Sequence, residues 1–272
     1  MKLRVLAALL AAVAAPCFAA ERIVTLSPHL AELVCAAGAC DKLAGVVAYS
    51  DYPPQLASLP HVGDAFHVNL ERILALKPDL VLAWQGGSSE QTVARLRALG
   101  LTVESLQVRR LDEIADAVDA LGVKLDRRDV AHAAAEAVRS KLRDLRARYA
   151  AAKPIKVFYE IQVQPLYTVN ADSPITEAIA LCGGSNVFAS LGMLAGPVSL
   201  ESVFSADPDV VIYERQDEGP TRAFWRAHPQ LRAVANGRLY PIDADLLSRA
   251  TPRMLDGIEE LCRAMERARP QK

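Results

Sequence analysis

The 272-residue sequence has no surplus of charge of either sign. Its 31 Lys and Arg residues nearly balance 32 Asp and Glu residues, which leaves a formal net charge of −1. Proteins that bind nucleic acid usually carry a basic surplus, so the composition argues against a nucleic-acid partner. Hydrophobic residues make up 51% of the chain, enough for a well-buried core in one large or two ordinary domains.

The sequence also lacks the motifs of the common catalytic sites. It contains no Gly-x-Ser-x-Gly elbow, no Gly-x-x-x-x-Gly-Lys loop and no His-Glu-x-x-His motif. Its five histidines are isolated from one another: His29, His61, His67, His132 and His228. The cysteines do not form the two closely spaced pairs of a structural zinc site. We therefore expect neither an enzyme nor a resident metal or cofactor.

The only long apolar run lies at the N-terminus. Residues 1–19 begin with Lys2 and Arg4, continue with an apolar stretch, and end with Cys17 and Ala19 at the −3 and −1 positions of a cleavage site. This pattern predicts a secretory signal peptide rather than a membrane anchor, which needs roughly 20 apolar residues. A lipoprotein attached through Cys17 is a weaker alternative. We expect a soluble protein exported to the periplasm.

Removal of the leader leaves four cysteines in an oxidising compartment: Cys35, Cys40, Cys182 and Cys262. They allow three pairings. A bridge between Cys182 and Cys262 is favoured, because it would tie the second half of the chain to its C-terminal helix. Cys35 and Cys40 could pair locally if a helix ends near Gly38. Two buried free thiols remain an equal alternative for that pair.

Short apolar or β-branched runs alternate with helical patterns along the chain. In the first half they cover residues 22–26, 43–47, 79–84 and 101–106, and in the second half 156–161, 209–213 and 238–242. This alternation predicts parallel sheets with helices on their faces. The simplest α/β architecture is two Rossmann-like lobes, residues 20–125 and 153–272, with a ligand cleft between them.

Residues 126–152 predict a long rigid helix that joins the lobes. Asp126 is the candidate N-cap and Pro154 the candidate stop. Apolar residues recur at helical spacing on one face: Val130, Ala134, Val138, Leu142, Leu145 and Tyr149. An ordinary surface helix within one domain is the alternative.

Two pairs of similar segments indicate an internal duplication. Residues 70–80 read LERILALKPDL, and 130 residues later 200–210 read LESVFSADPDV. Residues 27–38 and 173–184 both start with Ser-Pro and end in cysteine and glycine, as helices with a serine N-cap do. Glu71 and Glu201 therefore fall in equivalent first turns, where an acid either stabilises its helix or serves a docking surface.

Four aromatic residues lie at or just past the predicted strand ends or in connecting loops: Tyr49, Phe66, Trp84 and Tyr167. Ligand sites in open α/β sheets form outside the carboxyl ends of the strands, where aromatics can cover a large planar ligand. These positions predict a binding cleft, with rim or core packing as the alternative.

At AYSDYPPQ, NLERILALKPDLVLAW, LCGGSNVF and SRATPR the sequence resembles the cobalamin-binding branch of the helical-backbone (class III) periplasmic substrate-binding proteins of ABC importers. The resemblance covers essentially the whole mature chain. It implies two lobes, little closure on binding, and a monomer that delivers cobalamin or a related corrinoid to an inner-membrane permease. A haem or iron-siderophore carrier on the same fold is the alternative.

The resemblance also implies roles for individual residues. Pocket aromatics correspond to Tyr49, Trp84 and Tyr167, with Phe66 as an added candidate, and ligand contacts of the second lobe to Asp245, Leu246, Leu247, Ser248 and Arg249. It implies a disulfide between Cys182 and Cys262. It further implies that Glu71 and Glu201 meet arginines of the permease.

The chain departs from this pattern at two positions. Ala65 and Ala195 stand where enterobacterial members have pocket tryptophans, and Phe66 could replace one of these by a shift of one residue. Cobalamin recognition should then be weaker, or the preferred ligand a different corrinoid such as cobinamide. His29 and His67 are candidates to reach a cobalt or haem iron.

Overall fold

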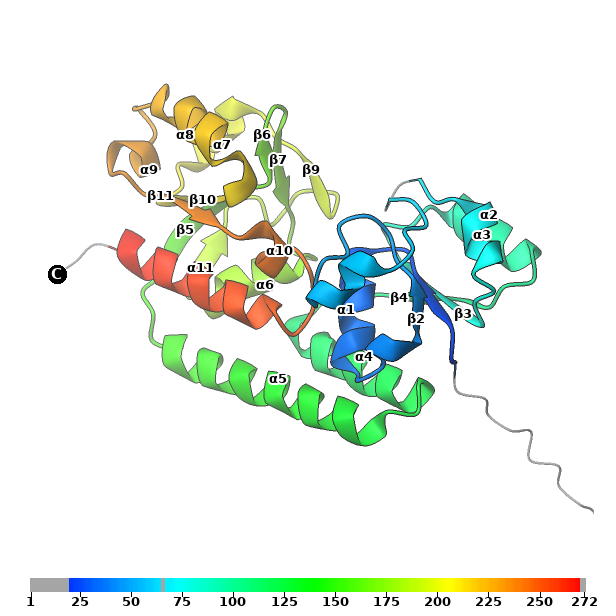
Figure 1. Ribbon diagram of the computed structural model, residues 1–272. Coiled ribbons are helices and arrows are strands. Elements are labelled where there is room, and N and C mark those ends of the chain that lie inside the picture. The colour runs from blue at the N-terminus through cyan, green and yellow to red at the C-terminus, as the bar shows by residue number, and fades with distance from the viewer. Residues whose placement is uncertain (1–19, 65–66, 270–272) are drawn as a thin grey trace, which may run out of the picture.

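A computed structural model describes residues 20–64 and 67–269 as two α/β lobes side by side (Figure 1). The predicted signal peptide, Ala65 and Phe66 lie outside the described residues. Each lobe contains a four-stranded parallel sheet. The long helix α5, Arg128–Tyr149, runs beneath both lobes. The predicted fold class is therefore confirmed.

The first lobe is built on the strand order β2-β1-β3-β4. Its strands are β1 (Ile23–Thr25), β2 (Leu43–Gly45), β3 (Leu80–Trp84) and β4 (Val103–Leu106), and its helices are α1 (Pro28–Ala36), α2 (Leu70–Ala75), α3 (Glu90–Ala98) and α4 (Leu111–Lys124), with short 3₁₀ turns at Cys40–Lys42 and Pro54–Ser58. Successive strand residues enter different cores: Leu82 packs in the cluster that holds α1 and α4, and Val81 in the cluster that holds α2 and α3. Both faces are buried, which explains the continuous apolar strands.

The second lobe has the strand order β11-β10-β5-β8. Its strands are β5 (Ile155–Glu160), β8 (Gly184–Asn186), β10 (Val210–Glu214) and β11 (Leu239–Ile242), and its helices are α6 (Pro174–Leu181), α7 (Leu200–Ala206), α8 (Glu218–Arg226), α9 (Arg232–Ala235), α10 (Ala244–Leu247) and α11 (Met254–Ala268), with a 3₁₀ turn at Arg215–Asp217. A separate antiparallel sheet consists of β6 (Gln162–Val163), β7 (Leu166–Val169) and β9 (Ala195–Pro197). All seven predicted strands are present, whereas this small sheet and β8 were not predicted.

The helix α5 differs in detail from its prediction. Its N-cap is Arg127, because Asp126 adopts a left-handed conformation with φ 55°, which a capping residue does not have. It ends at Tyr149, before Pro154. The buried face consists of Ala131, Ala135, Val138, Leu142, Leu145 and Tyr149. Ala134 is half-buried and packs against the main core, so of the predicted face only Val130, which is 55% exposed, was assigned wrongly.

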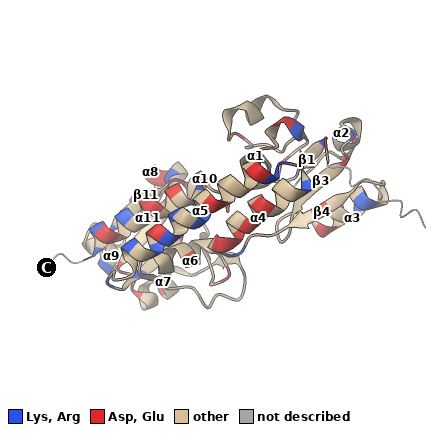
Figure 2. Ribbon diagram, turned by 90° about the horizontal axis from the view of Figure 1, so that it is seen from below, with Lys and Arg blue, Asp and Glu red and all other residues tan. Residues whose placement is uncertain are grey.

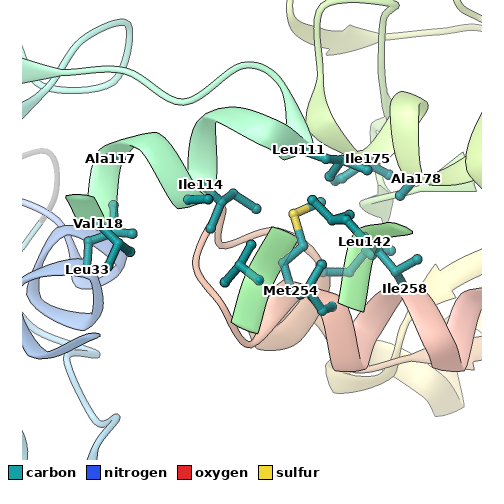
Figure 3. Packing of buried hydrophobic residues seen from close by; sticks show 14 of the residues in the cluster. Leu33, Leu111, Ile114, Ala117, Val118, Leu142, Ile175, Ala178, Met254 and Ile258 are labelled. Atoms are coloured by element: carbon teal, nitrogen blue, oxygen red, sulfur yellow. The ribbon is translucent and has the colours of Figure 1, made fainter. Parts of the chain in front are cut away.

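A single hydrophobic cluster continues from one lobe into the other. It includes Leu33 of α1, Val118 of α4, Leu142 of α5, Ile175 of α6 and Ile258 of α11. Figure 3 shows Leu33 and Val118 at one end of this packing and Ile175 and Ile258 at the other. Since protein interiors are packed as densely as crystals, the lobes share one core and resist displacement relative to each other.

Ion pairs add to the attachment of α5. Arg139 contacts Asp116 and Asp119 of α4, at 2.9 and 2.8 Å, and Lys141 contacts Asp256 of α11 at 2.6 Å. Figure 2 shows acidic and basic residues interspersed along α5 and its neighbours. Charged residues of the linking helix thus form ion pairs with helices of both lobes.

The duplicated segment repeats its local geometry. Lys77 and Asp207, each directly before the proline, have φ values of 48° and 42°. Asp79 then accepts hydrogen bonds from the backbone N–H groups of Glu21 and Arg22, and Asp209 accepts one from Lys156. In both lobes, residues at equivalent positions end a helix and hold the start of a neighbouring strand in place.

Both disulfides are formed, Cys35 with Cys40 and Cys182 with Cys262. The favoured pairing is confirmed, and the alternative of two free thiols is wrong. The local bridge is possible because α1 ends at Ala36 and Gly38 turns the chain with φ 81°. Within residues 20–64 and 67–269, no helix has the length and apolar character needed to span a membrane.

Candidate functional site

A cleft of about 610 Å³ lies between the two lobes. The first lobe contributes His29, Trp84, Gln85, Gln107, Val108 and Arg109, and the second lobe contributes Ile161, Val169, Asp172, Ser173, Pro174, Ile175, Leu194, Ala195, Glu214, Ser248, Arg249 and Ala250. This volume is within the range of cofactor and small-molecule sites.

The parallel sheets explain where the cleft forms. Trp84 is the last residue of β3, Gln107 follows β4, Ile161 follows β5 and Glu214 is the last residue of β10. The carboxyl ends of parallel strands meet at one edge of a sheet, and ligands bind there in open α/β folds. In this protein the two edges face one cleft.

Trp84 forms an aromatic wall of the cleft. Its backbone N–H donates to Oγ of Ser88 over 2.9 Å, which fixes the turn after β3. A side chain at Gly87 would overlap the indole, so glycine is required for the ring to lie where it does. The His29 ring contacts the indole edge-on, with centroids 5.1 Å apart and an interplanar angle of 87°.

His29 is an uncharged imidazole in this cleft. It lies in the first turn of α1, directly after Ser27 and Pro28, and its Nε2 is 3.4 Å from Oγ of Ser27. Burial, and after it the positive charge of Arg249, lower the pKa of His29 from 6.5 to about 4. The ring therefore carries no charge at neutral pH.

Arg249 lines the cleft and is held in place by several hydrogen bonds. Its guanidinium donates to Oε1 of Glu32 at 2.9 Å, to Oδ1 of Asp51 at 3.0 Å and to the carbonyl oxygen of Tyr49 at 3.2 Å. It also contacts Oδ1 of Asp245 at 2.7 Å. Burial opposes the charge, but the hydrogen bonds to Glu32 and Asp51 raise the pKa of Arg249.

Glu32 accepts hydrogen bonds from several residues of the opposite lobe. Besides Arg249 it accepts hydrogen bonds from Oγ1 of Thr251 at 3.0 Å and from Nε and Nη2 of Arg253 at 3.1 and 2.8 Å. The Arg253 guanidinium also lies 3.7 Å from the ring centroid of Tyr52. A buried carboxylate satisfied in this way fixes one lobe against the other.

A second polar contact between the lobes is centred on Glu177 of α6. Its carboxylate accepts from the backbone N–H of Leu111, the first residue of α4, at 2.9 Å, and lies 3.4 Å from both Arg110 and Arg146. Together with the shared core, these contacts keep the cleft in its shape before any ligand enters.

The structure places the predicted site residues unequally. Trp84, Ser248 and Arg249 line the cleft. Tyr49, 77% exposed, and the half-buried Tyr167 lie outside its lining, and Phe66 lies outside the described residues.

The remaining residues of the predicted loop support the cleft rather than line it. Asp245 pairs with Arg249, and Leu246 packs against Gly257 of α11. Leu247 is fully buried in the main core, so the prediction of a ligand contact is wrong for its side chain. The residue belongs to the packing of α10.

Several lining residues were missed by the sequence analysis, namely Gln85, Gln107, Arg109, Asp172 and Glu214. Three of them end a strand or directly follow one, so their position in the strand pattern was an available signal. Asp172 belongs to the unpredicted region between β7 and α6. Ala195 lines the cleft, whereas His67 does not and instead pairs with Asp64 at its exposed position.

Glu71 and Glu201 occupy equivalent exposed places in the two lobes. Glu71 is in the first turn of α2 after the Asn69 cap, and Glu201 is in the first turn of α7 after the Ser199 cap. In Figure 1 both helices lie on the side of the molecule away from α5. Hydrogen bonds from its own backbone N–H and from Ser199 lower the pKa of Glu201, so it carries a full negative charge at neutral pH.

The sequence profile of the periplasmic binding proteins matches residues 23–246. The chain belongs to this family. It is 40% identical over 255 residues to the vitamin B12-binding protein of Vibrio cholerae serotype O1. The aligned residues cover 93% of this chain and 92% of that protein. Both the predicted family and the predicted location in the periplasm are confirmed.

Solved structures give the same relationship. The crystal structure of the periplasmic vitamin B12 binding protein BtuF of Vibrio cholerae superimposes with a TM-score of 0.86 and 40% identity, covering 93% of this chain and all of that one (100%). A periplasmic heme binding protein from Pseudomonas aeruginosa reaches a TM-score of 0.79 at 26% identity, covering 93% and 95%.

Proposed function

We propose that this protein captures cobalamin or a related corrinoid in the periplasm and delivers it to the permease of an ABC importer. The observation that carries the proposal is the cleft described above, in a chain that is 40% identical over 93% of its length to a vitamin B12-binding protein. On this proposal the chain is a transport component without catalytic activity, and it acts as a monomer.

The chemistry of the lining suits a corrinoid. A corrin is a large, nearly flat ring whose edge carries amide groups. Trp84 offers an aromatic surface to the ring, while Gln85, Gln107 and Ser248 offer donors and acceptors to the amides. A mostly preformed pocket with a few polar groups is the usual design of a cofactor site.

The charge of the lining favours a corrinoid over haem. Two basic residues, Arg109 and Arg249, are balanced by two acidic ones, Asp172 and Glu214. Arg249 is moreover already paired with Glu32, Asp51 and Asp245. Haem carries two carboxylates that need unpaired cations, whereas amides do not, so an evenly charged lining supports the corrinoid.

The ligand would lie against Trp84, Ser248 and Arg249, with Tyr49, Phe66 and Tyr167 as rim contacts, and Asp245 would act by holding Arg249. Glu71 and Glu201 would dock the permease. Their repetition, once per lobe on a rigid frame, suits a two-fold partner that presents a basic patch on each subunit.

Titration of the purified protein with cyanocobalamin, cobinamide and haemin, followed by calorimetry and visible spectra, tests the proposal. We expect saturable binding of at least one corrinoid and weaker binding of haemin. Failure of both corrinoids to bind with a Kd below roughly 10 µM would refute it. Tight binding of haemin alone would support the haem carrier instead.

A further inference from the structure

His29 lines the cleft beside Trp84 but is not one of the proposed ligand contacts. Its place is fixed by the backbone: Ser27 precedes the helix, Pro28 is its first residue, and the imidazole packs edge-on against the indole. A side chain held in this way presents its ring to the ligand without further ordering. The cost of fixing it is already met by the fold.

The imidazole has an electron pair to give. Among the described residues its one hydrogen-bond contact is the long one of 3.4 Å between Nε2 and Oγ of Ser27. Burial, and after it the positive charge of Arg249, lowers the pKa of the ring and keeps it neutral. A neutral imidazole is the form that binds metals, since protonation removes the donor nitrogen.

The protein supplies too few ligands for a free metal ion here. Within residues 20–64 and 67–269, no group of three or more His, Cys, Asp or Glu side chains could hold one. A metal inside a tetrapyrrole or corrin ring is different, because the ring provides four equatorial nitrogens. Such a ligand needs only one donor from the protein, on the axis perpendicular to the ring.

We propose that His29 binds the metal of the captured macrocycle as an axial ligand. The inference rests on the proposed function and deepens it, since it selects corrinoids with an exchangeable axial position. In the binding step the bond between cobalt(III) and a water molecule breaks, the water leaves, and a cobalt–nitrogen bond to His29 forms. No proton or electron is transferred, because the imidazole is neutral and the cobalt stays trivalent.

One lining residue of the second lobe is small. Ala195 of β9, an exposed residue with a single methyl group, contributes to the lining there. A macrocycle that approaches the His29 side therefore meets only a methyl group at position 195.

Visible spectroscopy of bound corrinoids tests the inference. We expect diaquocobinamide to shift its absorption bands on binding to the wild-type protein, as replacement of water by imidazole nitrogen changes the cobalt ligand field. Dicyanocobinamide, whose two axial positions are filled, should bind with no shift. In His29→Ala the shift should disappear, and the affinity ratio of the diaquo over the dicyano form should fall about tenfold or more.

His132→Ala is the matched control, since His132 is exposed on α5, pairs with Asp119 and lies outside the cleft. It should keep both the shift and the ratio. Diaquocobinamide that binds to wild type with an unchanged spectrum would overturn the inference and leave the proposed function standing, and so would a shift that persists in His29→Ala. Absence of binding by every corrinoid would instead refute the proposed function. The wild-type comparison decides even if the variant does not fold.

Discussion

Oε1 of Glu32 lies 2.9 Å from Nη1 of Arg249, although 217 positions separate the two residues. Glu32 belongs to α1 of the first lobe, and Arg249 follows α10 of the second. Their side chains are only 3% and 10% exposed. One ion pair therefore does two things: it holds the lobes together and it fixes the arginine that lines the cleft.

Removal of Glu32 should destabilise the whole protein. In Glu32→Ala the guanidinium groups of Arg249 and Arg253 lose a buried partner, and breaking a buried ion pair in this way costs about 3–5 kcal/mol. Urea unfolding should report a decrease of that size in the free energy of unfolding. Glu104→Ala is the control, because its pair with Lys124 is exposed on both sides and is worth less than about 1 kcal/mol. Equal losses in the two variants would contradict this account of Glu32.

The two disulfides should differ in their contribution to stability. Cys182 and Cys262 close a loop of 80 residues, whereas Cys35 and Cys40 close one of 5. Loop-closure entropy predicts about 4.5 kcal/mol for the long loop and about 2 kcal/mol for the short one. Unfolding of the double alanine variants at each pair, measured by circular dichroism, should rank them in this order. The reverse order would show that native packing around the short bridge outweighs chain entropy.

The sequence was most informative where a residue's neighbours along the chain determine its structure. Ser27 and Ser173 before proline were predicted to start helices and do so, and all seven apolar runs predicted as strands are strands. Asp126 was misassigned because its left-handed conformation follows from the turn between α4 and α5, which the helical pattern alone does not reveal.

Prediction of the site was limited by contacts between distant segments. Trp84 and Arg249 were predicted by resemblance and line the cleft, but nothing local shows that Glu32 meets Arg249. Leu247 was assigned to the site by resemblance, but it is the last residue of α10 and its side chain is buried in the main core. His29 was noted as a candidate metal ligand, but its contact with Trp84 depends on how α1 crosses the end of β3.

An aromatic ring at position 195 should strengthen corrinoid binding. Ala195 is exposed and lines the cleft on the second lobe, so an indole there can cover the ring from the side opposite Trp84. At about 25 cal/mol per Å², roughly 60 Å² of added apolar contact is worth about 1.5 kcal/mol, or roughly tenfold in Kd. Calorimetry with dicyanocobinamide measures this for Ala195→Trp. Ala195→Leu separates a planar stacking surface from mere bulk, and an equal gain in both variants would argue against stacking.

The paired glutamates predict a loss of transport without a loss of binding. Glu71 and Glu201 are exposed, repeat at equivalent first turns and lie outside the cleft lining. Their removal therefore leaves the ligand site untouched while it deletes one charge per lobe from the proposed docking surface. In Glu71→Ala/Glu201→Ala we expect corrinoid affinity within about twofold of wild type and permease-dependent uptake reduced about tenfold or more, because rim charges mainly control association.

Glu90→Ala is the control for this prediction, since Glu90 is likewise an exposed first-turn acid, of α3, but has no counterpart in the duplicated segment. Its uptake should equal that of wild type. Each single variant should fall between wild type and the double variant, because one lobe can still meet its permease subunit. The salt dependence gives an independent check: uptake by wild type should weaken as ionic strength rises, and the double variant should respond less. Unchanged uptake in the double variant would mean that the two acids only stabilise their helices, the role that a first-turn glutamate has without any partner.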